Sequence, residues 1–310
     1  MKAMNLAVVT LNVRNSAPSN LENQTDPILQ LIHGEFRRRS AWRHRREHLA
    51  KTLLDTDSDI IGLQEVLSDQ FDFLSSSLMS RYDMVGVGRD DGKRKGEFAP
   101  IAFRKDKFEC IEWNTFWLSE TVDVVGSKYP GACCVRICTW ARLKLREEGG
   151  NDNHCPQILV ANAHLDHKSE SARTFGCKVI DQNIRNIMKE GEAVIVLGDF
   201  NFQTAGEEGY RMLLNASQND PSLEPRWRDS YTDIAKKSMT PSDIERFGVT
   251  FHDFGRSSGL RIDFIFYLPQ NGSTMIQTMD SKVTRDGEDG VTCFVSDHYV
   301  LSSKFLITYQ

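Results

Sequence analysis

Polar residues follow short apolar segments at several places in this chain, and their types are those that bind metal ions and move protons. In VIVLGDFN, four strand-forming residues precede Gly198, Asp199, Phe200 and Asn201. Residues two apart in an extended strand project from the same face, so Asp199 and Asn201 are expected to point at one place beyond the strand. Gly, Asp and Asn are also common turn formers, and this segment taken alone is more typical of a turn.

The same arrangement recurs elsewhere in the chain. The other polar residues that end or interrupt strand-like segments are Asn12, Glu65, His164, Asp263, Asp297 and His298. A single residue of this kind is usually a cap, a turn or a structural histidine. A repeated set of Asn, Asp, Glu and His indicates one shared site.

This set of side chains points to one kind of chemistry. Carboxylate and amide oxygens without thiolates suit hard cations such as Mg²⁺ or Mn²⁺ rather than structural zinc. Such ions commonly act on phosphate, whose oxygens complete their coordination shell. Histidines beside carboxylates add proton transfer and charge stabilisation near neutral pH. The set therefore predicts metal-assisted chemistry on a phosphate ester.

Composition narrows the class of protein. The 310 residues carry a net charge of −5, which gives no support to a broadly basic surface for nucleic acid, although a local patch could serve. No apolar run approaches the ~18 residues that span a bilayer. The N-terminal MKAMNLAVVTLNV is interrupted by polar residues and fits a first strand better than a signal peptide. Seven cysteines without a CxxC pair argue against disulfides and a zinc site, so a cytoplasmic or nuclear location is expected.

Short β-rich segments alternate with stretches of helical spacing, which predicts an α/β fold with sheet inside and helices outside. Strands are expected at 6–13, 60–64, 101–104, 134–145, 158–164, 194–200, 262–268 and 300–308. Helices are expected at 43–54 and 169–188. Residues 1–310 are expected to form one domain and a monomer, with an insertion loop at 15–40.

Eight segments stand in an order that resembles the endonuclease/exonuclease/phosphatase superfamily, which has the DNase-I-like fold. They are TLNVR, LQEV, KGEFAPIAFRKDKFE, TFWLSE, NAHLDH, GDFN, RIDFIF and SDHY. GDFN together with the C-terminal SDH is the more specific pair, and the resemblance covers nearly the whole chain. It implies a four-layer αββα sandwich, with two packed mixed β-sheets flanked by helices and the active site at one edge of the sheets.

The resemblance also implies a Mg²⁺- or Mn²⁺-dependent hydrolase in which water attacks phosphorus in line. The metal ligands it implies are Glu65, Asn12 and Asp297. The catalytic residues it implies are His164, Asp199, Asn201, Asp263, His298 and Glu97. Asp263 would orient His298, and Glu97 would orient His164, which donates to a phosphate oxygen. The general base is either Asp199 or the Asp263–His298 pair.

The substrate is a phosphate ester whose class stays open. Arg136, Asp166 and His167 are the candidates for binding it. A nuclease-type substrate is favoured over a phosphosugar, an inositol phosphate or a phospholipid headgroup. A non-catalytic scaffold is the remote alternative, because no expected ligand is missing.

Two further features bear on nucleic acid. The basic stretch at 37–46 either contacts phosphates or is a solvated helix face. Phe98, Trp117 and Phe251 could stack on bases, although aromatic residues in strands usually belong to the core.

Overall fold

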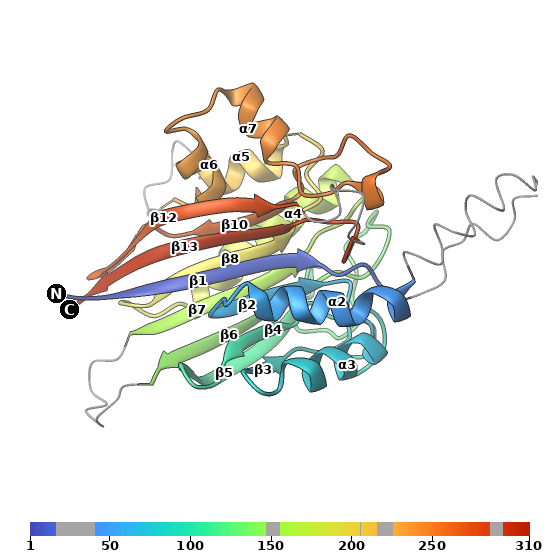
Figure 1. The fold of residues 1–310 in the computed structure, drawn as a ribbon, viewed down its shortest axis with the longest axis horizontal. Coiled ribbons are helices and arrows are strands. Elements are labelled where there is room, and N and C mark those ends of the chain that lie inside the picture. The colour runs from blue at the N-terminus through green and yellow to red at the C-terminus, as the bar shows by residue number, and fades with distance from the viewer. Residues whose placement is uncertain (17–40, 147–155, 205, 216–225, 286–293) are drawn as a thin grey trace, which may run out of the picture.

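Figure 1 shows two β-sheets stacked face to face, with helices on their outer sides. In this computed structural model the described residues are 1–16, 41–146, 156–204, 206–215, 226–285 and 294–310. The basic residues 37–39 and most of the expected insertion lie outside them.

The first sheet has seven strands in the order β11-β12-β13-β1-β2-β4-β3. Strand β1 runs parallel to β2 and antiparallel to β13, so the sheet is mixed. The strands are β1 (Lys2–Asn12), β2 (Ile60–Gln64), β3 (Tyr82–Val85), β4 (Ile101–Arg104), β11 (Gln270–Asn271), β12 (Thr274–Thr284) and β13 (Val300–Tyr309).

The second sheet has six strands in the order β5-β6-β7-β8-β10-β9. Strand β7 runs parallel to β8, and the neighbouring β10 runs antiparallel to β8. The strands are β5 (Phe108–Trp117), β6 (Ile137–Leu145), β7 (Gln157–His164), β8 (Ala193–Asp199), β9 (Arg228–Asp229) and β10 (Asp263–Tyr267).

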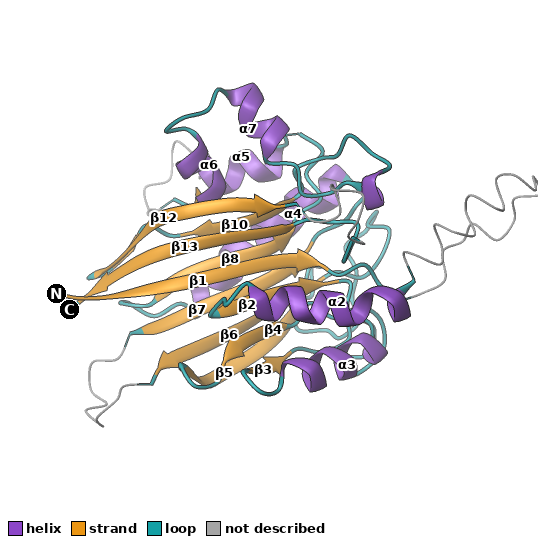
Figure 2. Ribbon diagram, in the orientation of Figure 1, coloured by secondary structure: helices purple, strands orange, loops and turns teal. Residues whose placement is uncertain are grey.

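The helices complete the outer layers and one end of the molecule, as Figure 2 shows. Helices α2 and α3 cover the outer face of the seven-stranded sheet, and α4 and α5 cover that of the six-stranded sheet. Helices α6 and α7 contribute side chains to the end of the core between the sheets. Their bounds are α2 (Trp42–Asp55), α3 (Ser68–Leu78), α4 (Glu170–Ile187), α5 (Glu208–Asn215), α6 (Ser230–Ala235) and α7 (Pro241–Phe247).

Alternation along the central strands creates these layers. In β8, Ile195 and Leu197 belong to the core between the sheets, whereas Val194 and Val196 pack under the outer helices. Successive strand residues face opposite sides, so a strand that is covered on both faces reads as a continuous apolar run. One core between the two sheets and one between each sheet and its outer helices confirm the expected four-layer αββα sandwich.

Most expected elements are confirmed, with two differences near the site. Strand β6 begins at Ile137 rather than residue 134, because its pairing with β5 ends at Ile137 opposite Trp117. Strand β8 ends at Asp199, so the extended geometry assumed for Asn201 is wrong: that residue has a φ of 53°. Strand β2 ends at Gln64 as expected, and Glu65 follows it with a φ of 59°.

Several elements were not expected from the sequence, among them α3, β3, β5 and β12. Helix α3 is rich in Ser and Asp, which are poor helix formers. Strands β5 and β12 are partly exposed and lack a continuous apolar run. Among the described helices, none is long and apolar enough to cross a bilayer.

Candidate active site

A cleft of about 560 Å³ lies at the edge where strands of both sheets deliver polar side chains. Strands β1, β2, β7 and β8 end at this edge, and β10 and β13 begin there. In Figure 1 it is the edge away from the two chain termini. The sandwich therefore brings together polar residues that are far apart in the sequence.

The Asn12 amide links two acidic residues across the sheets. Its Nδ2 donates to Glu65 at 3.1 Å and to Asp199 at 2.9 Å. Asn15 Nδ2 also donates to Glu65, at 2.9 Å, and Arg14 Nη1 lies 3.5 Å from the same carboxylate. Burial opposes ionisation of Glu65, but Arg14 and the hydrogen bonds from Asn15 and Asn12 lower its pKa below the ordinary value. Glu65 is thus ionised at neutral pH, the form in which a carboxylate can bind a cation.

Asp263 and His298 form the expected pair. His298 Nδ1 lies 2.7 Å from Asp263 Oδ2, and both residues are buried. Burial disfavours the imidazolium, but Asp263, Asp199 and Asp297 outweigh it and raise the pKa of His298 to about 10. This pair therefore presents a fixed positive ring to the cleft.

Asp199 faces both histidines of the site. Its Oδ2 lies 3.4 Å from His164 Nε2 and 4.0 Å from His298 Nε2. Burial and the nearby Asp263 raise the pKa of Asp199 to about 7. Its Oδ1 accepts the Asn201 backbone N–H at 3.0 Å. A carboxyl group fixed from several sides, with a pKa near neutrality, suits proton transfer.

Asn201 reaches the cleft by a different route from the one expected. Its backbone is left-handed, a conformation that costs a non-glycine residue about 1 kcal/mol or more. Its Nδ2 donates to Leu165 O at 3.1 Å, which anchors the side chain to the loop after β7. Asn201 and Asp199 still line the same cleft. A left-handed turn, rather than an extended strand, brings them together.

Glu97 stands near His164 without the expected hydrogen bond. The distance from His164 Nδ1 to Glu97 Oε2 is 3.8 Å, and this Nδ1 has no hydrogen-bond partner among the described residues. Glu97 instead pairs with Arg89 and lies 3.6 Å from Arg136 Nη1. Burial, together with Arg136 and Arg89, lowers the pKa of His164 well below its ordinary value. His164 is therefore neutral, and its orientation by Glu97 stays a prediction.

Two of the three residues expected to bind substrate line the cleft. Arg136 and His167 do so, and Arg136 Nη2 lies 3.1 Å from His167 Nδ1. Asp166 does not line it: this buried carboxylate accepts the backbone N–H groups of Cys133, Lys168 and Ser169. Asp166 therefore connects the loop that contains Cys133 to the turn that contains Lys168 and Ser169.

Of the residues expected to contact nucleic acid, some line the cleft and others are buried elsewhere. Phe98 and Trp117 are buried outside the cleft lining, whereas Phe251 lines it. In the basic stretch, Arg45 is buried and donates to the backbone carbonyls of Val13, Arg14 and Val295. Arg45 therefore cannot reach a phosphate, and its role is structural.

Sequence reasoning missed other residues that line the cleft. They are Arg14, Asn15, Arg89, Cys133, Cys134, Lys168, Gln203, Leu260 and Ile262. Arg14 and Asn15 lie two and three residues after Asn12 in the segment NVRN, so their closeness to a predicted site residue could have indicated them. Arg89 and the cysteines lie in loops, and nothing in their local sequence indicates that they face the cleft.

Two groups of side chains compete as a site for a hard cation. Asp199, Asp263 and His298 offer donor atoms within 4.8 Å of one another. However, Asp263 and His298 are hydrogen-bonded to each other through Oδ2 and Nδ1, and Asp263 does not line the cleft. Glu65 and Asp297 do line it, and the Arg14 guanidinium lies 3.5 Å from one and 3.7 Å from the other. Their carboxylate oxygens are the hard donors that Mg²⁺ or Mn²⁺ prefers, and an ion bound between them would replace the Arg14 guanidinium as their positive neighbour.

The fold and these acid and imidazole groups define a hydrolase of phosphoric esters. A model of the Endonuclease/Exonuclease/phosphatase family matches residues 9–298, and the chain belongs to this family. Its members hydrolyse phosphoester bonds and are generally dependent on divalent metal ions. The resemblance inferred from the motifs is thereby confirmed.

Solved structures of similar proteins cover the whole fold. An endonuclease/exonuclease/phosphatase from Bacteroides vulgatus is 29% identical, with a TM-score of 0.75, and the match covers 99% of this chain and 100% of that one. A mannosyl-6-phosphatase from Bacteroides thetaiotaomicron is 27% identical, with a TM-score of 0.71, over 97% of this chain and 99% of that one.

One curated relative is named as a nuclease rather than as a phosphatase. The CCR4-Not complex 3'-5'-exoribonuclease subunit Ccr4 of Kluyveromyces lactis is 23% identical over 190 residues, or 53% of this chain. The match covers 24% of that protein, so this chain corresponds to about a quarter of its length.

Proposed function

We propose that this protein is a Mg²⁺-dependent phosphatase of a small phosphorylated molecule, with a sugar phosphate as the reference substrate. The observation that carries the proposal is Arg136, which is buried but lines the cleft. Its Nε and Nη1 have no hydrogen-bond partner among the described residues, and the carboxylate of Glu97 lies 3.6 Å from Nη1, beyond hydrogen-bond distance. Buried guanidinium N–H groups without a hydrogen bond are costly and suit a ligand with several charged oxygens, such as a phosphate dianion.

The shape and lining of the cleft support a small substrate. A volume of about 560 Å³ falls within the range of small-molecule sites. Arg89, Arg136 and Lys168 supply positive charge on the lining, and Phe251 and Leu260 supply apolar surface. The mannosyl-6-phosphatase of similar fold supports the same substrate class. On these grounds we place a sugar phosphate ahead of the nuclease-type substrate that the sequence favoured.

The roles of the site residues follow from their placement. Glu65 and Asp297 would hold Mg²⁺ or Mn²⁺, with Asn12 fixing Glu65 from behind. Such an ion neutralises charge on the phosphoryl oxygens and lowers the barrier to attack by water. Asp199 takes the proton from the attacking water, because its pKa of about 7 suits a base, whereas His298 is already protonated.

The remaining polar groups stabilise the negative charge that develops on phosphorus. His298 donates from Nε2, since Asp263 occupies Nδ1. His164 is neutral and keeps one ring N–H to donate. Preorganised donors of this kind are each worth about 3–4 kcal/mol in the transition state. The Asn201 backbone N–H acts through Asp199, whose Oδ1 it holds at 3.0 Å.

A 3'-5' exoribonuclease is the second candidate. Phe251 supports it, because an aromatic ring on the cleft lining could stack on a base. The exoribonuclease named among the curated relatives supports it as well, although that match covers about half of this chain.

A direct comparison of substrates tests the proposal. Phosphate release from mannose 6-phosphate and shortening of end-labelled single-stranded RNA are measured with Mg²⁺ and with EDTA. We expect Mg²⁺-dependent phosphate release and a loss of kcat/KM of about 10- to 100-fold in Arg136→Ala, the cost of a charged hydrogen bond. Arg94→Ala is the control, because that arginine is exposed and pairs with Asp72. RNA shortening without phosphate release from mannose 6-phosphate would contradict the phosphatase proposal and favour the exoribonuclease.

A further inference from the structure

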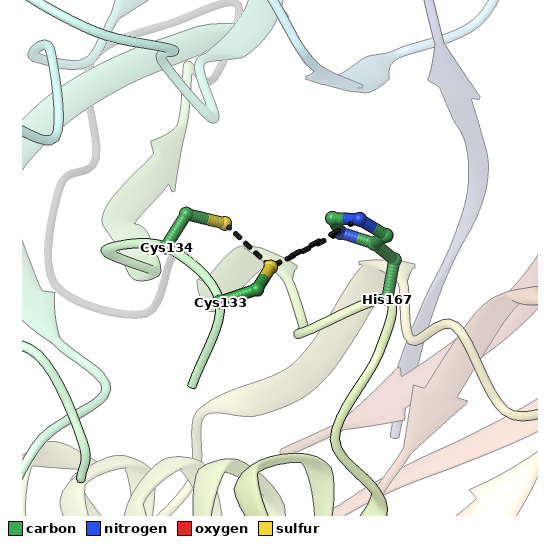
Figure 3. A group of neighbouring side chains, drawn as sticks. All are labelled: Cys133, Cys134 and His167. Carbon is green, nitrogen blue, oxygen red and sulfur yellow. Dashed lines mark hydrogen bonds between the residues drawn. The ribbon is translucent and has the colours of Figure 1, made fainter. Parts of the chain in front are cut away.

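Three side chains on the cleft lining, Cys133, Cys134 and His167, have no part in the chemistry described above. Figure 3 shows the two thiols and the imidazole turned toward one another. Cys133 Sγ lies 3.4 Å from Cys134 Sγ and 3.4 Å from His167 Nδ1. One donor atom from each of the three residues lies within 4.8 Å of the others.

We propose that Cys133, Cys134 and His167 form a second metal site, which takes a soft or borderline cation such as Zn²⁺. Two thiolates and an imidazole with no carboxylate among them select Zn²⁺ or Cd²⁺ rather than Mg²⁺. The site is separate from the Glu65 site in its ligands and in the ion it prefers. It does not depend on the identity of the phosphate ester.

The spacing of the donor atoms fits tetrahedral coordination. Zn–S bonds of about 2.3 Å at tetrahedral angles place two sulfur atoms about 3.8 Å apart. The observed 3.4 Å between the cysteine sulfurs is within a few tenths of an ångström of that value. Small side-chain rotations therefore suffice, and the fourth position stays open toward the cleft.

The backbone around the three ligands is already fixed. Asp166 accepts the Cys133 N–H at 2.7 Å, and its other oxygen accepts the N–H groups of Lys168 and Ser169 at 2.9 Å. One carboxylate thus ties the loop that carries both cysteines to the turn that carries His167. Cys133 and His167 are exposed, so an ion can enter from solvent.

Binding changes the charges around the site in a defined way. Each thiol loses its proton to solvent, and two thiolates with one divalent ion and a neutral imidazole make a neutral unit. The Arg136 guanidinium, now 3.1 Å from His167 Nδ1, must release that nitrogen if it becomes a ligand. The absence of a CxxC pair, which argued against zinc in the sequence, does not exclude this arrangement, because the third ligand comes from another loop.

Cadmium titration of the reduced protein tests the site. With excess Mg²⁺ present, Cd²⁺ is added while the ultraviolet charge-transfer absorption of cadmium–thiolate bonds is recorded. We expect the wild type to bind one Cd²⁺ in this way. Cys133→Ser should weaken binding at least ~100-fold, because even loss of an outer partner costs about 10- to 100-fold. The double variant C133S/C134S should lose the signal.

Cys110→Ser is the matched control, because that cysteine does not line the cleft. It should bind Cd²⁺ as the wild type does. X-ray absorption of the zinc-loaded wild type needs no variant and should show two sulfur ligands and an imidazole. Wild-type absorption that persists in C133S/C134S, or zinc surrounded by oxygen alone, would overturn the proposal.

Discussion

The Asp263–His298 pair gives the most specific prediction for a single residue, which concerns the turnover of the enzyme. Asp263 is fully buried and holds His298 Nδ1 at 2.7 Å, so Nε2 is aimed at the cleft beside Asp199. We expect His298→Ala to lower kcat by about 100- to 1000-fold, the usual cost of one transition-state donor, while the protein stays folded. Steady-state kinetics with circular dichroism measure both effects.

His44→Ala is the control for this substitution, because His44 is exposed on α2. Asp263→Asn should also lower kcat, since the amide cannot stabilise a positive ring. A folded His298→Ala variant with wild-type turnover would remove His298 from the mechanism.

Individual residues could be predicted from the sequence where a strand end fixed their direction. Asn12, His164 and Asp199 meet because parallel strands deliver their last residues to one edge. Asp166 could not be assigned in this way, because its partners are backbone N–H groups of loops. A carboxylate in a sequence such as HLDH looks the same whether it contacts a ligand or a neighbouring loop.

Among the elements, helix α2 connects the segments next to β1 and β13, a role that its basic sequence did not indicate. Arg45 lies on its buried face and donates to backbone carbonyls after β1 and before β13. Burial lowers the pKa of Arg45 to about 10, so the guanidinium stays charged at neutral pH. Helical spacing of the leucines predicted the helix, but not that one arginine would share their face.

Arg45→Met should therefore destabilise the fold and the site together. Buried carbonyls that lose a donor cost about 1–3 kcal/mol each, so we expect the free energy of unfolding in urea to fall by about 3 kcal/mol. Arg43→Met on the exposed face should change it little. Equal stability of the two variants would contradict the structural role of Arg45.

Helix α6 is tied to β10 by a buried ion pair that gives stability a pH dependence. Asp229 is the N-cap of this helix and pairs with Arg261, whose Nη2 lies 2.5 Å from Oδ2. Burial opposes ionisation of Asp229, but Arg261 and several hydrogen bonds lower its pKa. A folded pKa below the unfolded one gives stability that is present above about pH 4 and lost as pH falls through the folded value.

We expect Asp229→Asn to lower the free energy of unfolding by about 3–5 kcal/mol at neutral pH, because it breaks a buried pair. The difference from wild type should shrink in acid, where Asp229 of the wild type also becomes neutral. Urea unfolding at several pH values measures this. Asp55→Asn, at an exposed pair with Lys51, is the control. A difference that stays constant into acid would show that Asp229 is not the group responsible.

In the whole molecule, the cleft exists only because two sheets pack with their strand ends aligned. Asn12, Glu65 and His298 come from the seven-stranded sheet and its loops, and His164 and Asp199 from the six-stranded sheet. The periodicity of apolar residues alone predicted α/β layering. The two-sheet sandwich was predicted only through the resemblance of the ordered motifs to the family. The single domain, the monomeric state and the insertion at 15–40 stay predictions.

The central claim is that Glu65 holds a hard cation on which hydrolysis of a phosphate ester depends. Phosphate release from mannose 6-phosphate by EDTA-treated protein, before and after Mg²⁺ is restored, tests it most directly. We predict no release without the ion, full recovery with it, and no recovery in Glu65→Gln. Equal release with and without EDTA, or full recovery in Glu65→Gln, would contradict the claim.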